Sequence, residues 1–479
     1  MKIIETPIIP LKQSFAKRTG MERAIDRKAI CIFAATGFFL EADTFYTDEQ
    51  VLQPGTKYVL DADGQIKEQT VNFKWFHKPR DISFQTALDE FTDLFETIVQ
   101  EQTGSNPVIL PLSGGLDSRS QAVALKHMGA DVHSYSYSFV GGFKEHKISE
   151  HIAKACAFPF TALQIPTGYL WDVLDGAADI NKCYSEFTHP RQMAVLENLK
   201  QIPGEFSLGH WGDVFFDRGI AKQDAHLSEL GLIYKKVIKK SGLALASALW
   251  QSWDLEGDFE AYLKSRIQEL LHQIPIADTG AKIRAFKSLY WAPRWTSVSL
   301  SFFEAAHPVN VPYYDDKMCK FICEVPEAYL ADRQLQIAYI KNRNPKAARI
   351  PWQGQMPYNL YTYQNNKSPN NLPYRIRTKL KREIEALLGK KYIQRNWELQ
   401  FLGTKNETHL KRYLNEPSFL DFVGMDVVTN MYDKFKHDDP VFYSHAVSML
   451  LTLAVWYQKK EGSKITTYKE NLKRDFESH

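Results

Sequence analysis

The chain has 479 residues, of which 44% are hydrophobic and 24% are charged. This length and composition predict a globular protein built from two or three domains. The net charge of +3 is small for this length, which argues against a dedicated nucleic-acid-binding protein, whose domains are usually strongly basic. We therefore expect no nucleic-acid partner.

The cysteines and the apolar segments indicate a compartment. The five cysteines are scattered and odd in number, unlike those of a secreted disulfide scaffold. Cys319 and Cys323 have helical spacing, but no second pair of Cys or His completes a zinc site. Pro7 and Pro10 interrupt the N-terminal segment, which is not typical of a signal peptide. Because no apolar run reaches the ~18 residues of a membrane helix, we expect a cytoplasmic protein without a membrane partner.

The first 80 residues predict a small β-rich unit. Residues 31–45 are interpreted as strands with a turn at Gly37. Residues 56–61 alternate as a strand does, between the turn signals Pro54-Gly55 and Asp63-Gly64. A helix capped by Asp81 and stopped by Gly104 should then connect this unit to the rest of the chain, because its apolar residues recur at helical spacing.

From residue 107 the pattern alternates between apolar strands and helices. Strands are expected at 108–112, 133–139, 160–165 and the start of 205–216, and helices at 119–128 and 145–156. Such alternation predicts an α/β fold with a parallel sheet, right-handed crossovers and flanking helices.

The remainder of the chain is predicted to be mainly helical. Helices are expected over 225–345, where stripes of Trp and Phe favour core packing over a cofactor site. Residues 353–374 predict a long loop of the kind that often forms a lid or binding loop. The expected division is a β-rich unit over 1–80, a main domain over 81–460 and a polar tail over 461–479.

A glycine-rich motif lies between the strand at 108–112 and the helix at 119–128. Ser113 and Ser118 offer hydroxyl donors to phosphate oxygens, and Gly114 and Gly115 allow close backbone approach and positive φ. Successive backbone N–H groups form an anion-binding concavity, and the positive end of the helix dipole points to the same place. The motif therefore predicts a phosphate-binding loop.

Two charged residues in the motif need a separate account. Asp117 would repel phosphate, but it suits Mg²⁺, a hard cation that prefers carboxylate and phosphate oxygens. Arg119 either adds positive charge at the leaving group or is a surface residue. The alternative for the whole motif is a glycine turn capped by serines, with Asp117 exposed at a loop tip.

The run Ser113 to Ser118, SGGLDS, resembles the signature of the ATP pyrophosphatase loop, in a setting similar to that of the asparagine synthetase family. The resemblance covers about residues 80–350 and implies an adenine nucleotide alpha hydrolase-like fold that binds ATP and Mg²⁺. The nucleotide-binding residues that it implies are Leu112, Ser113, Gly114, Gly115, Leu116, Asp117, Ser118, Ser138 and Gly209.

Three later segments resemble the same family in the same order. The helix at 144–160 has matching residues at Glu145, Ile152 and Ala153, and the segment 207–216 resembles the second metal–pyrophosphate loop at Gly209 and Asp213. The third segment, 309–326, resembles the one that carries the family's Pro-Phe-x-Asp motif, here Pro312, Tyr313, Tyr314 and Asp315.

Asp213 also has a rationale of its own. It follows a strand of the predicted parallel sheet, and ligands of such sheets gather at the carboxyl ends of the strands. It should therefore share magnesium with Asp117, although a structural cap is the alternative. We expect Asp117, Asp213 and Arg119 to be catalytic. His210, next to Trp211 and near Asp217, could be a base, but a lone loop histidine is more often a bystander.

The sequence departs from the family at several positions. Lys2 follows Met1 where the family has its glutaminase cysteine, so glutamine is not expected to be the nitrogen source of this chain. Residues 1–80 would then be a shortened, inactive glutaminase-like remnant. Val214 replaces the glutamate of the second loop, and Asn310 replaces an arginine, which puts aspartate specificity in doubt. Lys341 lies near the place of a catalytic lysine, but its surroundings match poorly.

The function implied by the resemblance is that of an ATP-dependent carbon–nitrogen ligase that forms AMP and pyrophosphate. A small-molecule or peptide carboxylate would be adenylated and then attacked by an amine or by ammonia, which a separate protein could supply. An asparagine synthase-like role in amino-acid biosynthesis and a homodimeric state are further expectations. Two alternatives stay open: a non-catalytic nucleotide-binding or assembly protein, favoured by Val214, and an ATP pyrophosphatase acting on tRNA, disfavoured by the modest charge.

Overall fold

The computed structural model describes residues 1–142, 146–187, 191–217, 220, 222–388 and 396–477. A five-stranded parallel sheet has the strand order β10-β9-β6-β7-β8. The strands are β6 (Val108–Pro111), β7 (Val132–Phe139), β8 (Phe160–Ile165), β9 (Glu205–Ser207) and β10 (Val309–Asn310). The predicted α/β class with a parallel sheet is confirmed.

The strand order fixes where a site can form. From β6 the chain adds β7 and then β8 on one side, and later adds β9 and β10 on the other side. The order therefore reverses between β6 and β9, and the loops that follow these two strands leave the sheet at the same edge. In open parallel sheets, ligands bind in the crevice at such a switch point.

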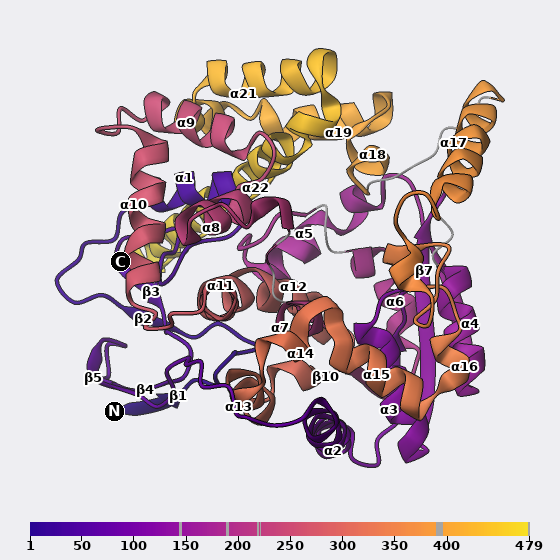
Figure 1. The fold of residues 1–479 in the computed structure, drawn as a ribbon. Helices are drawn as coiled ribbons and strands as arrows, with labels where there is room; N and C mark the ends of the chain where they lie inside the picture. The colour runs from indigo at the N-terminus through magenta and orange to yellow at the C-terminus, as the bar shows by residue number, and fades with distance from the viewer. Residues whose placement is uncertain (143–145, 188–190, 218–219, 221, 389–395, 478–479) are drawn as a thin grey trace.

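Helices cover the sheet as the alternating pattern predicts (Figure 1). On one side α3 contacts α2, α4 and α15, and on the other α5 contacts α12. Their bounds are α2 (Phe84–Thr103), α3 (Asp117–Met128), α4 (His146–Cys156), α5 (Tyr169–Asn181), α12 (Ser297–Glu304) and α15 (Gln334–Arg343). Ser83, and not Asp81, caps α2, because its Oγ accepts from Thr86 N at 3.0 Å. Glu145 lies outside the described residues.

The rest of the chain is mostly helical, as predicted for 225–345 and for the C-terminal hundred residues. The longer helices are α8 (Glu229–Val237), α9 (Gly242–Ser252), α10 (Phe259–His272), α11 (Thr279–Phe286), α13 (Asp316–Glu324), α17 (Leu372–Leu387), α19 (Thr404–Leu414), α21 (Met425–Asp433) and α22 (Pro440–Glu477). The backbone of residues 461–477 continues α22. The segment before α17 has only short 3-10 turns, in agreement with the predicted long loop.

The N-terminal region differs from the prediction in one element. Residues 31–45 contain no strand: their first part belongs to the helix α1 (Arg27–Thr36), which is capped by Asp26 and ended by Gly37 at φ 83°. Every residue from Ala29 to Thr36 is buried, so the run is apolar on all sides and has no period that distinguishes a helix from a buried strand. In Figure 1, α1 lies beside α9 and α22, which both contact it.

Strands still make up much of the first 71 residues. β1 (Lys2–Glu5), β4 (Thr56–Leu60) and β5 (Ile66–Val71) form an antiparallel sheet, and β2 (Phe15–Lys17) pairs with β3 (Glu49–Val51). β4 confirms the strand predicted at 56–61.

One helix has the length and composition of a membrane span, over Pro440–Lys460 of α22. However, 67% of its apolar window is buried inside the fold, and the core helix of a compact protein passes the same test. The part of the chain that the structure describes therefore contains no clear membrane span.

Candidate active site

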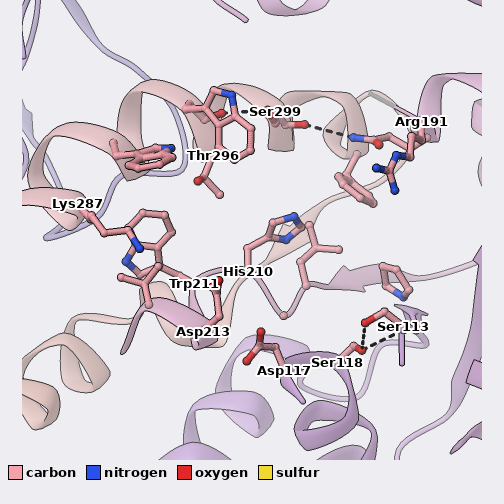
Figure 2. Close-up of a pocket in the computed structure, with 18 of the residues that line it drawn as sticks. Ser113, Asp117, Ser118, Arg191, His210, Trp211, Asp213, Lys287, Thr296 and Ser299 are labelled. Atoms are coloured by element: carbon pink, nitrogen blue, oxygen red, sulfur yellow. Dashed lines mark hydrogen bonds between the residues drawn. The ribbon is translucent and has the colours of Figure 1, made fainter. Parts of the chain in front are cut away.

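A cleft of about 600 Å³ lies where the loops after β6 and β9 meet (Figure 2). These two loops form one side. The other is formed by the π-helical segment η3 (Lys287–Thr296) and by α12. The lining residues are Pro111, Ser113, Asp117, Ser118, Tyr137, Arg191, Gln192, Leu208, Gly209, His210, Trp211, Asp213, Val214, Lys287, Trp291, Trp295, Thr296, Ser299 and Phe303.

The loop after β6 is held together by its two serines. Ser118 Oγ accepts from Ser113 N and lies 3.1 Å from Ser113 Oγ, and Gly115 N donates to Ser113 Oγ at 3.2 Å. The helix α3 begins directly behind it, and no side chain caps its N-terminus at Leu116. The loop therefore presents two hydroxyls and the positive end of a 12-residue helix to the cleft.

The glycines of this loop allow neighbouring atoms to approach its backbone closely, and they do not adopt an unusual backbone angle. Neither Gly114 nor Gly115 is among the described residues with positive φ, contrary to one reason given for them from sequence. A Cβ at Gly114 would lie 2.7 Å from Gln353 Cβ, and Gln353 N donates to Gly114 O at 3.0 Å. The start of the long loop predicted at 353–374 thus packs on the loop of residues 113–118, which we name the phosphate-type loop.

Asp117 is half-buried and is not exposed at a loop tip. Arg333 Nη2 and Gln336 Nε2 both donate to its Oδ1, the latter at 3.0 Å, and Gln336 also donates to Tyr313 Oη. Burial raises the pKa of Asp117 to about 6, Arg333 acts to lower it, and the negative charge of Asp213 raises it further. The two predicted carboxylates therefore influence each other across the cleft.

The loop after β9 packs directly on the loop after β6. A Cβ at Gly209 would lie 2.9 Å from Ser118 N, and one at Gly212 would overlap Asp117 Oδ1. Asp213 follows in the first turn of α7 (Gly212–Phe215) and lines the cleft. The predicted arrangement, with Asp117 and Asp213 at one edge of the sheet, agrees with this geometry (Figure 2).

The donor set suits a hard divalent cation. The hydrogen bonds that described residues make to Asp117 all end on Oδ1, which leaves Oδ2 available. Among the described residues, no hydrogen bond or ion pair holds the Asp213 carboxylate. Two facing carboxylates repel each other, and a shared Mg²⁺ would remove that repulsion while hydroxyls or phosphate oxygens complete its shell.

Backbone strain marks the same loop. Trp211 has φ 80°, a left-handed conformation that is rare for a bulky residue and costs of order 1–3 kcal/mol. Its indole Nε1 donates to Ser288 Oγ at 3.1 Å, which fixes the ring against η3. Strain of this kind is concentrated at functional sites, where surrounding contacts hold it.

Arg119 matches neither role expected from sequence. Its side chain is fully buried and does not line the cleft. The guanidinium donates to four backbone carbonyls: those of Gly114, Ala347, Ile350 and Pro351, at 2.8–3.3 Å. Arg119 therefore joins the phosphate-type loop to residues 347–351, because the carbonyls satisfy a buried charge that cannot be neutralised.

Several other predicted nucleotide-binding residues lie beside the cleft and not in its lining. Leu112 and Leu116 are buried under the loop, and Tyr137, not Ser138, faces the cleft from β7. His210 does line it, and burial lowers the pKa of its imidazole to about 4. An imidazole with that pKa is neutral at physiological pH.

The family-like segment at Pro312–Asp315 supports the site from behind. Tyr313 is fully buried and contacts Asp117 through Gln336, while Asp315 Oδ1 caps α13 by accepting from Lys317 N at 2.8 Å. We had expected Pro312–Asp315 to face the nucleotide, but this segment is not among the described residues that line the cleft.

The structure also shows where the two substituted positions, Val214 and Asn310, and the weakly matched Lys341 lie. Val214 lines the cleft, whereas Asn310 lies outside it and donates to Glu205 Oε2 at 3.1 Å. Lys341 Nζ lies 5.1 Å from the centre of the Tyr361 ring and does not line the cleft.

Sequence reasoning missed the residues that come from distant parts of the chain. Lys287, Arg191, Trp291 and Trp295 line the cleft, so the aromatic stripe is not core packing alone. Burial lowers the pKa of Lys287 to about 8, while the charge of Asp213 acts in the opposite direction. The sequence did contain one signal for this region, because Pro293 interrupts a helical pattern. In the structure Pro293 lies within the π-helix η3, and π-helices are often found at functional sites.

A comparison with known protein families matches part of this chain to one family. Residues 90–200 match the asparagine synthase family. The asparagine synthase segment includes β6, the phosphate-type loop, β7 and β8, and it confirms the resemblance predicted from the SGGLDS run. It covers less than half of the chain and ends before Gly209, so the family assignment of the second loop and of the Pro312–Asp315 segment stays a prediction.

The sequence matches no curated protein. Among solved structures, one similar chain is the U34-tRNA thiolase NcsA from Methanococcus maripaludis with its 4Fe-4S cluster. The identity is 11% over 44% of this chain and 86% of that chain, with a TM-score of 0.20. Similarity at this level supports no conclusion about function.

Proposed function

We propose that this chain is an ATP-dependent synthetase that adenylates a carboxylate and then forms an amide. A carboxylate oxygen bonds to the α-phosphorus of ATP as the bond from that phosphorus to the bridging oxygen breaks, and pyrophosphate leaves. An amine nitrogen then bonds to the acyl carbon, the carbon–oxygen bond to AMP breaks, and the nitrogen loses a proton. Catalysis of this kind depends mainly on positioning and on charge neutralisation.

One observation carries the proposal: the phosphate-type loop and two carboxylates, which follow two different strands of the sheet, share one cleft. The Ser113 and Ser118 hydroxyls and the N-terminus of α3 suit the leaving pyrophosphate. Asp117 and Asp213 would hold Mg²⁺, which supplies positive charge to the phosphate oxygens when bound. The match of residues 90–200 to the asparagine synthase family supports the same class of reaction.

The proposed nitrogen donor is an amine or ammonia from outside this chain. Every described residue that lines the cleft comes from residue 111 onward, and the described N-terminal strands contribute no side chain to it. Arg333 and Gln336 hold the Asp117 carboxylate in place and are proposed as positioning residues.

The test is magnesium-dependent exchange of pyrophosphate into ATP in the presence of a carboxylate substrate. We expect Asp117→Asn and Asp213→Asn each to lower the exchange rate by about 100-fold or more, because each removes a charge that binds the metal. Pyrophosphate exchange by a folded Asp117→Asn protein at the wild-type rate would show that the carboxylate has another role.

Asp315→Asn is the matched control. Asp315 lies in the family-like segment but outside the cleft, and its side chain caps α13. Asparagine is about as good a helix cap as aspartate, so this variant should keep both its stability and its exchange rate.

A further inference from the structure

The side of the cleft opposite the phosphate-type loop is aromatic. Trp291 and Trp295 from η3 and Phe303 from α12 line it, and Trp211, which reaches the same cleft from the loop after β9, extends this aromatic wall. With Tyr137 of β7, the described lining has five aromatic side chains in one cleft of about 600 Å³, which is typical of a site that buries an apolar group of a small molecule.

The tryptophans of this wall are fixed before any ligand binds. Phe38 stacks on Trp291 with ring centres 5.5 Å apart, and Trp295 lies at 77° to Trp291 with centres 6.3 Å apart. Lys239, which does not line the cleft, has its Nζ 5.6 Å from the Trp291 ring and 5.3 Å from the Trp295 ring. A wall already in place loses little conformational entropy on binding.

The charges beside this wall favour an acid and not an amino acid. Lys287 Nζ lies between two rings of the wall, 5.7 Å from Trp211 and 5.6 Å from Trp291, where its positive charge can hold a carboxylate. In the part of the chain that the structure describes, the acidic residues that line the cleft are Asp117 and Asp213, and the metal would occupy both. Among the described residues, no carboxylate of the lining is then left to pair with the ammonium group of a substrate such as aspartate.

We infer that the carboxylate substrate carries an aromatic or similarly bulky apolar acyl group, held against Trp291 and Trp295, with its carboxylate beside Lys287. This inference rests on the proposed adenylation. In this arrangement the carboxylate lies between Lys287 and the phosphate-type loop, as attack on the α-phosphorus requires. Trp291 and Trp295 determine specificity because they contact the acyl group and not the reacting atoms.

The experiment compares acids in the pyrophosphate-exchange assay. Phenylacetate, indole-3-acetate and 4-phenylbutyrate are set against acetate, aspartate and glutamate. We expect kcat/KM for the aromatic acids to be higher by roughly tenfold or more, the discrimination that an apolar pocket provides for a large group. Equal or better exchange with aspartate would overturn the inference while leaving the proposed adenylation intact.

Two variants, each with a matched control, test whether the aromatic wall and Lys287 bind the acid. Trp295→Ala should raise KM for phenylacetate by roughly tenfold without changing KM for ATP. Trp171→Ala, a half-buried tryptophan of another cavity, should change neither. Lys287→Met should raise KM for every acid tested, whereas Lys341→Met, which removes a half-buried lysine over the Tyr361 ring, should not. An unchanged KM in Trp295→Ala contradicts the inferred pocket.

A direct binding measurement separates this inference from the proposed reaction. If no acid supports exchange, calorimetric titration of phenylacetate into the wild type and Trp295→Ala decides between them. Binding to the wild type that is roughly tenfold weaker in the variant supports the pocket even though adenylation fails. The absence of binding to the wild type overturns the inference.

Discussion

The Asp117 carboxylate has two neighbours with opposite effects. Arg333 pairs with it and favours its charged form, while Asp213 disfavours that form. Arg333 is itself nearly buried, with 12% of its side chain exposed, and has φ 61°. A strained residue is thus held in place so that its guanidinium reaches a carboxylate at the start of α3.

This pairing distinguishes two substitutions of Asp117. Both substitutions remove the negative charge, but Asp117→Asn keeps a carbonyl oxygen that can accept from Arg333, whereas Asp117→Ala leaves no acceptor at this half-buried position. We therefore expect the free energy of unfolding of Asp117→Ala to be lower than that of Asp117→Asn by roughly 1–3 kcal/mol. The double variant Asp117→Ala/Arg333→Met should recover part of this loss, which urea unfolding of the variants measures. If Asp117→Ala and Asp117→Asn are equally stable, the Arg333 charge is solvated and the pair contributes little.

At the scale of elements, the contact between α1 and α9 joins the N-terminal region to the main body. The carbonyl of Ala35 accepts from Lys239 N at 3.0 Å, and His445 Nε2 lies 3.0 Å from Ala34 O. Gly242, the first residue of α9, lies so close that a Cβ added there would overlap the Ala35 carbonyl oxygen. The end of α1 is therefore surrounded by backbone that cannot move independently.

Gly242→Ala should destabilise the protein, because the overlapping atom is backbone and not a mobile side chain. We expect a loss of about 1–3 kcal/mol, the usual cost of overpacking. Gly176→Ala in α5 is the control: nothing lies within 4 Å of its added Cβ, so it should be neutral or stabilising by up to about 1 kcal/mol. Chemical denaturation of both variants checks the difference, and equal stabilities would contradict the close contact of α1 with α9.

At the scale of the whole molecule, a single hydrophobic core extends through the described chain from Ile8 to Trp456. Phe45, from the N-terminal region, stacks on Trp456 of α22 with ring centres 4.2 Å apart. A second, much smaller apolar cluster is formed by β2, β4 and Leu52, the residue after β3, and it includes Ala16 and Tyr58. A continuous core predicts that the N-terminal region and the rest unfold together.

The cysteines report on this cooperativity because all five are buried free thiols, in different parts of the fold: Cys31, Cys156, Cys183, Cys319 and Cys323. Burial raises the pKa of each thiol, to about 12 for Cys156 and about 11 for Cys323, which keeps the reactive thiolate scarce. Native protein at about pH 8 should therefore resist a thiol reagent. As the denaturant concentration rises, all five thiols should become reactive in one transition, which mass spectrometry of the labelled protein measures. Labelling of Cys31 well before the others would show that α1 unfolds separately.

The sequence by itself determined the features that depend on local signals. The strand β6, the SGGLDS loop and α3 follow one another over residues 108–128. Their limits are set by an apolar run, a glycine-rich turn and Gly129 in the left-handed conformation. The parallel sheet followed from the alternation of elements, and the meeting of the Asp117 and Asp213 loops from the rule that such loops leave one edge of a sheet.

The tertiary structure decided whatever depends on contacts between distant residues. The α1 run is apolar on every side, so only its burial between α9 and α22 made it a helix. Arg119 had no assignable role until residues 347–351 supplied carbonyls for its guanidinium. Lys287 and the tryptophans of η3 line the cleft because η3 packs against the loop after β9, where Trp211 Nε1 donates to Ser288 Oγ. Local patterns cannot encode such pairings, since each needs a partner more than a hundred residues away or a packing arrangement that only the folded chain provides.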